Sequence, residues 1–385
     1  MNPIPVVEKI MTEFAESTGL SKVNAPARRY LWTDAFAVCN FLELYRQMED
    51  ESWRQSALRL VDQVHYVLGR HRDEDSRTGW ISGLPEEAGK RHPTTGGLRI
   101  GKPLNERRVT DPCNNHLEWD RDGQYYHYLT KWMHALNRVS RATGNSIFNI
   151  WAIQLAKVAH KGFVRVLPDG TKRMYWKMSI DLSYPLVPSM GQHDPLDGLI
   201  TYNQLQATAA EFSDVAPDLR LEIADMSAIC QAKSWETEDP LGIGGLLSDA
   251  YKIVQLIIDQ RFMQKGWLDD LLGSSLSGLD AVVASHLLEL AADYRLAFRE
   301  LGMAIGLHAV ERMKERMGEK PDQFPANHPA FSLLNRLGRY THLSETIERF
   351  WLDPRNRKAQ SWTDHLDINR VMLATSLAPD GYLVI

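Results

Sequence analysis

Two acidic segments contain the residues best suited to acid–base chemistry, and each precedes a predicted helix. They span 118–127 (EWDRDGQYYH) and 189–198 (SMGQHDPLDG). Carboxylates at a helix N-terminus experience the positive end of the helix dipole. One carboxyl group can then stay ionised while a more buried one keeps its proton, as glycoside hydrolysis requires. We therefore predict Asp122 and Asp194 as a catalytic pair, assisted by His193, whose ordinary pKa lies near neutrality.

Helix capping explains the same acids without any catalysis. Asp is among the commonest N-cap residues, because its carboxylate accepts hydrogen bonds from the first free amides of a helix. Asp120 or Asp122 could cap the first helix, and Asp194, which precedes Pro195, could cap the second. Both interpretations remain open at this stage.

A Trp-Thr-Asp tripeptide occurs near both ends of the chain, at 32–34 and 362–364, and each copy opens an apolar stretch. If the chain closes into a helical ring, the two copies meet at one mouth together with His365. An indole ring can stack on a sugar while a carboxylate binds its hydroxyls. Capping and packing explain the tripeptide equally well.

These segments and the tryptophans of two insertions give the predicted substrate-binding residues. They are Trp32, Asp34, Trp80, Glu118, Trp119, Asp120, Tyr126, His127, Trp176, Gln192, Asp197, Trp362, Asp364 and His365.

Helical periodicity extends over nearly the whole chain and predicts eleven or twelve helices. The segment 279–317 is too long for one ordinary helix, so we expect a break near Tyr294 or Gly302. The predicted helical segments are 5–14, 34–47, 52–69, 123–142, 146–160, 196–210, 218–233, 241–262, 279–317, 331–351 and 364–377.

Two insertions interrupt the helices. Residues 70–121 combine glycine, proline and charged residues with one tryptophan, which predicts a long ordered loop. In 162–189, two short apolar runs flank Pro-Asp-Gly, which predicts a β-hairpin. No change of composition marks a boundary, so we predict a single domain over residues 1–385.

The composition argues against several classes of partner. The net charge of −5 does not favour the binding of nucleic acid. The sequence contains no run of about 18 apolar residues, so we expect no membrane span. The N-terminus lacks the apolar core of a secretion signal, so we expect a cytoplasmic protein. Three distant cysteines predict neither a disulfide framework nor a metal site, and Gly242–Gly245 does not follow a strand as a dinucleotide motif would. We expect no cofactor and no metal.

Paired helices, Trp-Asp motifs at helix starts and β-insertions together resemble the six-hairpin glycosidase-like (α/α)6-toroid superfamily. The resemblance implies an all-α toroid whose inner helix ends build the pocket, and a carbohydrate-active enzyme. Hydrolases of this group use carboxylates, which Asp122 and Asp194 would supply. Sugar 2-epimerases use histidines to remove and return a proton, roles that His193 and His365 would fill.

Three hypotheses follow for the function. The first is a glycoside hydrolase acting on a saccharide through Asp122 and Asp194. The second is a sugar epimerase or isomerase, and the third is a non-catalytic toroid that acts as a binding module. The sequence does not specify the sugar, the linkage or the oligomeric state.

Overall fold

The computed structural model describes residues 2–21, 27–112, 114–212, 217–231, 233–262 and 266–385. The chain divides into two compact units. Unit 1 consists of Met1–Phe14 and Lys233–Ile385, and unit 2 of Ala15–Ala232. The single domain over 1–385 stays a prediction.

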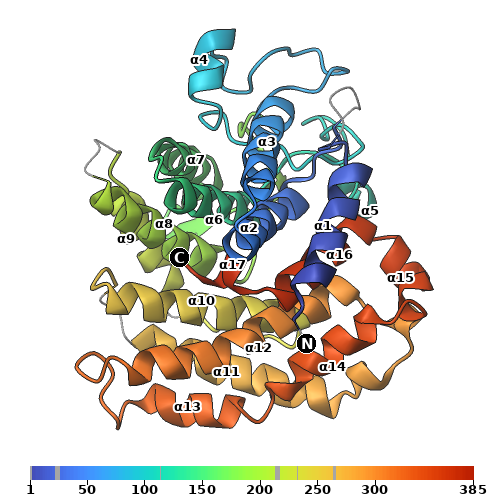
Figure 1. Ribbon diagram of the computed structural model, residues 1–385. Coiled ribbons are helices and arrows are strands. Elements are labelled where there is room, and N and C mark those ends of the chain that lie inside the picture. The colour runs from blue at the N-terminus through green and yellow to red at the C-terminus, as the bar shows by residue number, and fades with distance from the viewer. Residues whose placement is uncertain (1, 22–26, 113, 213–216, 232, 263–265) are drawn as a thin grey trace. The chain divides into compact units, whose positions relative to one another are not determined.

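Unit 2 contains three helical hairpins. Helix α2 (Leu31–Met48) is followed by α3 (Glu51–Leu68), α6 (Tyr126–Thr143) by α7 (Ile147–Phe163), and α8 (Asp194–Glu211) by α9 (Arg220–Cys230). In α2 every residue from 31 to 44 is buried, whereas α3 buries a single stripe. A helix that is buried all round is an inner helix and a helix with one buried stripe is an outer one. Helices α6 and α8 pack with α2 as the inner members (Figure 1).

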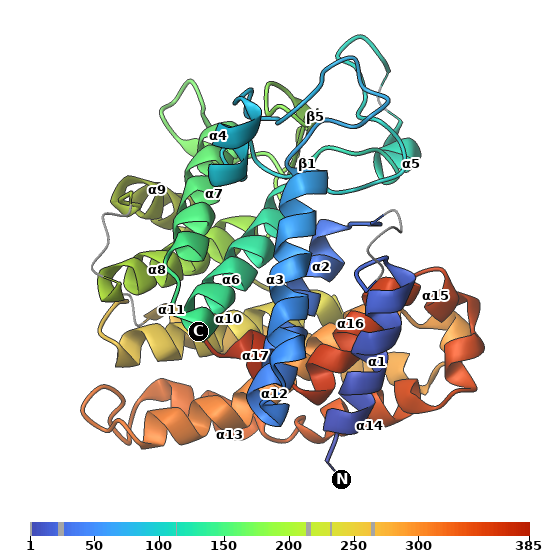
Figure 2. The same cartoon turned by 45° about the horizontal axis from the view of Figure 1, so that its top comes forward.

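The two insertions of unit 2 form one layer at one end of its helices (Figure 2). The long loop is ordered where described, and it carries α4 (Glu86–Arg91) and α5 (Asn115–Glu118). The predicted hairpin is confirmed: β2 (Val164–Val166) pairs antiparallel with β3 (Lys172–Met174). A second sheet was not predicted. Its strand order is β1 (Gln124–Tyr125), β4 (Lys177–Met178), β5 (Pro185–Val187). The sheet therefore joins the end of the long loop to the second insertion.

Unit 1 is helical throughout its described residues. Its elements are α1 (Ile4–Ser17), whose last residues already belong to unit 2, α10 (Pro240–Ile258), α11 (Gly266–Ala284), α12 (Ala297–Gly318), α13 (Pro329–Leu337), α14 (His342–Leu352), α15 (Gln360–Thr363), α16 (Leu366–Leu377) and α17 (Asp380–Leu383), with short 3-10 turns η1 (Leu287–Glu289), η2 (Ala292–Tyr294) and η3 (Asn356–Lys358).

The predicted break near Tyr294 is confirmed, since α11 ends at Ala284 and α12 begins at Ala297. The prediction of one helix over 331–351 is wrong. The chain turns at Gly338, where the carbonyl groups of Arg336 and Leu334 accept its backbone N–H, and a new helix begins at His342.

Gly244, in the glycine-rich segment 242–245, serves helix packing. Helices α10 and α12 lie side by side in unit 1 (Figure 1), and a Cβ on Gly244 would sit 2.0 Å from the carbonyl oxygen of Gly302. A Cβ on Gly306 would likewise sit 2.6 Å from the carbonyl oxygen of Gly244. Only glycine permits this approach of two backbones. Helix α10 is also long and apolar enough to cross a membrane, but 78% of its most apolar window is buried.

Candidate functional site

The N-terminal ends of α2, α6 and α8 gather an aromatic cluster in unit 2. The ring of Trp32, at the start of α2, lies 5.7 Å from the His127 ring and 5.2 Å from the Tyr128 ring, both at the start of α6. The indole Nε1 of Trp32 is buried and has no hydrogen-bond partner among the described residues. We refer to Trp32, His127, Tyr128 and the side chains around them as the aromatic site.

His127 is the one titratable ring in the middle of this cluster. Its Nδ1 lies 3.9 Å from Oδ1 of Asp194, and its side chain is 27% exposed, so a ligand can reach it. Burial lowers the pKa of His127 to about 4, with Asp197 opposing the shift and Lys131 adding to it. The imidazole is therefore neutral at pH 7 and able to accept a proton.

A stack of parallel rings holds the imidazole from the other side. The Tyr125 ring lies 5.8 Å from His127 at an interplanar angle of 14°, and 4.9 Å from Trp176 at 8°. Tyr125 is thus enclosed between the two other rings. The strand pair β1–β4 fixes the stack, because Tyr125 belongs to β1 and Trp176 directly precedes β4. The insertion therefore orients a side chain that belongs to an inner helix.

A pair of hydroxyl groups borders the same cluster. The hydroxyl oxygens of Tyr30 and Tyr128 are 2.5 Å apart, and the ammonium of Lys102 lies 5.3 Å from the centroid of the Tyr30 ring. Burial raises the pKa of Tyr30 to about 12, although the hydrogen bond to Tyr128 opposes this. Both phenols consequently stay protonated at neutral pH. Because one hydroxyl donates to the other, the second hydroxyl of the pair can donate to a ligand oxygen.

One turn into α6, Lys131 forms an ion pair with Asp197. Its Nζ lies 3.1 Å from each carboxylate oxygen, and both side chains are nearly buried. This pair links α6 to α8 beside His127. Since the carboxylate is held by the lysine, Asp197 acts on His127 through its charge.

Asp122, predicted as a catalytic carboxylate, is fully buried and held by four donors. The guanidinium groups of Arg99 and Arg72 lie 2.6 and 3.4 Å from its Oδ2, and the amides of Gly101 and Gly123 donate to its Oδ1. No surface of this side chain is open to a substrate or to water. These contacts give Asp122 a structural role that joins the long loop to the start of β1.

The capping interpretation of Asp120 and Asp122 is also wrong. Helix α6 begins at Tyr126, its N-cap residue is Tyr125, and no side chain caps it. Strand β1 separates the acids from the helix. In α8, Asp194 is the first helical residue and follows the N-cap residue His193.

Asp194 lies beside the aromatic site. Its carboxylate folds back over Gly191, where a Cβ would sit 2.4 Å from Oδ2. His193 is half-buried and Gln192 is exposed on the same loop. The structure thus places Asp194 beside His127, one helical turn before Asp197, whereas Asp122 is enclosed by Arg99 and Arg72.

Glu118 serves the fold rather than a ligand. It is buried, accepts a hydrogen bond from Nε of Arg107 at 2.8 Å, and lies 3.4 Å from Nζ of Lys177. Burial lowers the pKa of Lys177, which is completely enclosed. Of the neighbouring predicted residues, Trp119 and Asp120 are exposed.

Other predicted binding residues are taken up by packing. Tyr126 is buried and donates a hydrogen bond to the Tyr202 hydroxyl at 2.7 Å. Trp80 is buried and donates from Nε1 to Glu86. Asp34 accepts from the backbone amide of Tyr30 and so fixes the first turn of α2.

The second Trp-Thr-Asp copy belongs to unit 1. Trp362 is buried, and its ring stacks on Trp351 at 5.5 Å. Asp364 is exposed, and the ring of His365 lies 5.4 Å from that of Phe298. The expected meeting of this copy with the one in unit 2 stays a prediction.

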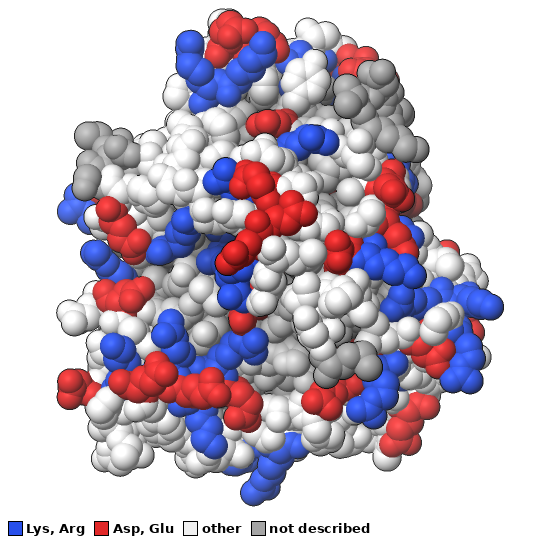
Figure 3. Space-filling model, in the orientation of Figure 1, with Lys and Arg blue, Asp and Glu red and all other residues white. Residues whose placement is uncertain are grey.

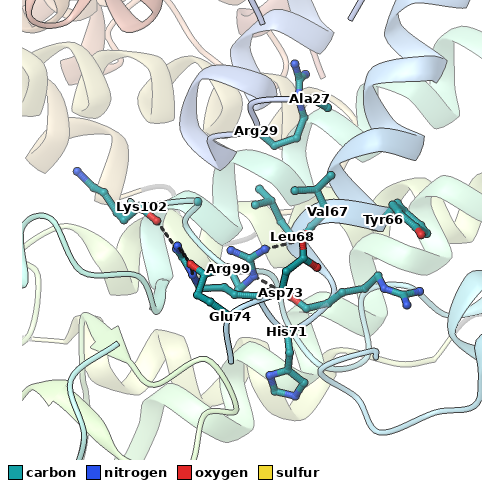
Figure 4. A pocket seen from close by; sticks show the side chains of 13 residues that line it. Ala27, Arg29, Tyr66, Val67, Leu68, His71, Asp73, Glu74, Arg99 and Lys102 are labelled. Carbon is teal, nitrogen blue, oxygen red and sulfur yellow. Dashed lines mark hydrogen bonds and ion pairs between the residues drawn. The ribbon is translucent and has the colours of Figure 1, made fainter. Parts of the chain in front are cut away.

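Unit 2 also contains an arginine-rich pocket of about 370 Å³ (Figure 4). Arg99 occupies its centre, while Lys102 and His71 point away from it in different directions. Carboxylates neutralise its arginines, which argues against a strong anion site. The pairs are Arg29–Asp34, Arg70–Glu86, Arg72–Glu74 and Arg99–Asp122.

No group of three or more His, Cys, Asp or Glu side chains within the described ranges could hold a metal ion.

On the face drawn in Figure 3, acidic and basic side chains are interspersed.

Sequence reasoning missed Tyr30, Tyr128 and Lys131. A signal for two of them was present: in a helix that begins near 126, positions 127, 128 and 131 share one face. Tyr30 directly precedes the Trp-Thr-Asp copy at 32–34.

No protein-family model and no curated protein matches the sequence. Solved structures do match. A cellobiose 2-epimerase from Spirochaeta thermophila has a TM-score of 0.50 at 12% identity, over 97% of this chain and 98% of that chain. A sugar epimerase from a ruminal bacterium has a TM-score of 0.49 at 9% identity, again over 97% and 98%. A cellobiose 2-epimerase from Bacillus thermoamylovorans has a TM-score of 0.41 at 12% identity, over 89% and 88%.

The likeness to the Spirochaeta structure covers nearly the whole of both chains. At the level of the fold it confirms the predicted all-α (α/α)6 toroid. A shared fold does not by itself establish an activity.

Proposed function

We propose that this protein is a carbohydrate-active enzyme of the epimerase or isomerase type, with His127 as the group that removes a proton from the sugar. The observation that carries the proposal is a neutral, partly exposed imidazole, held by a ring stack and placed beside Asp194. Sugar epimerisation next to a carbonyl needs a base of this kind, which removes a proton from carbon. The fold shared with a cellobiose 2-epimerase agrees with this chemistry.

The other parts of the site suit the same reaction. Removing the proton gives an enediolate, whose oxygen becomes negative, and protonated His127. A proton then returns to carbon: delivery to the neighbouring carbon gives an isomer, and delivery to the same carbon on its opposite face gives an epimer. Donors placed where that charge develops lower the barrier. The Tyr30–Tyr128 hydroxyl pair and the Lys102 ammonium beside the Tyr30 ring are donors of this kind. Trp32 supplies an aromatic ring beside His127.

The hydrolase hypothesis, which the sequence favoured, has less support. It requires two carboxyl groups on either side of a glycosidic bond. Asp122 is enclosed and neutralised by Arg99 and Arg72, so Asp194 lacks its predicted partner.

Solvent exchange distinguishes the hypotheses. The purified protein is incubated in D2O with mono- and disaccharides of glucose and mannose, and proton NMR follows the carbon next to the anomeric centre. The proposal predicts a second epimer or isomer that carries deuterium, and loss of that exchange in His127→Asn. Cleavage of the disaccharide without deuterium at carbon would support a hydrolase, and binding without either reaction would support a binding module.

A further inference from the structure

We propose that Trp119 forms a subsite for a second sugar ring, so that the substrate is an oligosaccharide of at least two residues. The inference rests on the proposed function, because it takes the substrate to be a saccharide. Trp119 is 58% exposed, and it is the only exposed residue among the eleven tryptophans, all of which lie in the described ranges. A tryptophan at the surface offers an apolar ring face together with a polar N–H, which suits stacking on a sugar ring.

Hydrogen bonds from a buried side chain fix the backbone around Trp119. The buried ammonium of Lys177 donates to the carbonyl oxygens of Glu118 and Arg121, on either side of the exposed indole. Nε of Arg107 holds the Glu118 carboxylate. Burying a lysine ammonium is unfavourable unless hydrogen bonds or an opposite charge compensate it. Here these hydrogen bonds fix the short segment that carries Trp119. A platform ordered before binding loses little entropy when a ligand stacks on it.

The platform connects to the aromatic site through adjoining rings. The Trp119 ring lies 5.5 Å from Trp176 at an angle of 57°, and Trp176 stacks on Tyr125, which in turn stacks on His127. The two ends of this series are an exposed indole and the proposed base. A sugar reacting at His127 would therefore extend its next residue towards Trp119.

The chemistry around Trp119 favours a sugar over an apolar partner. Asp120 is exposed, and Arg121 lies half-buried with its NH1 4.0 Å from the Asp111 carboxylate. Sugar hydroxyls can bond these charged groups while the ring face covers the indole. An apolar protein surface would bury the charges without compensation. Leu117 is also exposed here, but its aliphatic side chain offers no ring face on which a sugar could stack.

The test compares sugar length in the wild type and in Trp119→Ala. Glucose, cellobiose and cellotriose, with mannose, mannobiose and mannotriose, are the probes, and both tryptophan fluorescence and kcat/KM are measured. We expect wild-type binding at least tenfold tighter for disaccharides than for monosaccharides in at least one series. Trp119→Ala should remove that advantage and change monosaccharide values less than twofold, while Trp119→Tyr should restore part of it.

Leu117→Ala is the matched control, because it removes an exposed apolar side chain from the same segment without touching the ring series. It should leave the length preference unchanged. Wild-type binding with no length dependence, or equal losses for mono- and disaccharides in Trp119→Ala, would overturn the subsite. A change of molar mass in sedimentation of Trp119→Ala would instead assign the indole to self-association.

The two proposals fail separately. Length-dependent binding that requires Trp119 but shows no proton exchange keeps the subsite and rejects the epimerase. Exchange that depends on His127 but is equally efficient for monosaccharides keeps the epimerase and rejects the subsite.

Discussion

The Nδ1 atom of His127 lies 3.9 Å from Oδ1 of Asp194, at the point where α6 and α8 both begin. Two helices from different hairpins thus place a neutral base next to a carboxylate. A carboxylate at this distance can stabilise, through its charge, the imidazolium formed when the ring accepts a proton. The predictions below follow from this pair and from the structure that supports it.

Replacing His127 with Asn should lower kcat by about a hundredfold or more, since general base catalysis contributes 10² to 10⁴. The binding constant for the sugar should change much less, because the other rings of the aromatic site remain. Kinetics and fluorescence titration measure the two effects. His92→Asn, an exposed histidine in the long loop, is the control and should retain full activity. Equal activity of both variants would remove His127 from the mechanism.

The pH profile should reflect the low pKa of His127. Because burial lowers this pKa to about 4, the imidazole is neutral above that pH, and kcat/KM should lose activity on the acid side near pH 4 instead of near 6.5. In Trp176→Ala the stack opens to solvent, so the pKa of His127 should rise towards 6.5.

Histidine NMR titration measures this pKa directly, without reference to activity. The control is Trp119→Ala, which removes a ring that touches Trp176 but not His127, and it should leave the titration unchanged. A pKa that does not move in Trp176→Ala would show that the stack does not set the environment of His127.

Asp122→Ala should destabilise the fold by about 3–5 kcal/mol, because it leaves the Arg99 guanidinium buried without its carboxylate. Urea unfolding followed by circular dichroism measures the loss. Asp120→Ala, two residues earlier and exposed, should change the free energy of unfolding by less than about 0.5 kcal/mol. Similar stabilities for the two variants would contradict the structural role of Asp122.

His65 should make stability depend on pH. Its Nε2 accepts a hydrogen bond from Trp132, and burial lowers its pKa to about 3. Between pH 6.5 and about 3 the unfolded chain binds a proton that the folded chain does not. Stability should therefore fall as the pH drops below 6.5, by about 1.4 kcal/mol per unit from this residue.

His65→Gln removes this titration and should reduce the slope of stability against pH by about that amount, with His342→Gln, an exposed histidine, as control. An unchanged slope in His65→Gln would mean that other groups carry the acid sensitivity.

Adjacent glycines of α10 should respond in opposite ways to alanine. A Cβ on Gly244 meets the carbonyl oxygen of Gly302 at 2.0 Å, so Gly244→Ala should separate α10 from α12 and destabilise the protein by about 1–3 kcal/mol. A Cβ on Gly245 would meet no described atom within 4 Å, and Gly245→Ala should stabilise by about 0.5–1 kcal/mol. Thermal unfolding of the pair provides the comparison, and a loss in both would contradict the packing.

Helical periodicity predicted most of the helices and the hairpin around 168–170, because both depend on local spacing and turn residues. It failed over 331–351, where the apolar spacing continues on both sides of the turn at Gly338. The sheet that joins β1 to β4 could not be predicted, since its two strands are short and more than 50 residues apart.

The candidate site was predicted in part. The segment 118–127, predicted as part of the site, contains the histidine on which the proposal now rests, but the sequence favoured its acids as the catalytic groups. In the sequence, Asp122 lies among other acids before a predicted helix, as a catalytic carboxylate would. Its ion pairs with Arg99 and Arg72, which are distant in the sequence, could not be predicted. Tyr30 and Trp176 reach the site through tertiary contacts that no local pattern records.

The most direct test of the central claim is solvent exchange at the carbon next to the anomeric centre. Wild-type protein and His127→Asn are incubated with cellobiose and mannobiose in D2O and followed by NMR. The proposal predicts deuterium at that carbon together with a new epimer or isomer for the wild type, and neither for His127→Asn. Exchange that persists in the variant, or disaccharide cleavage with no exchange in the wild type, would contradict it.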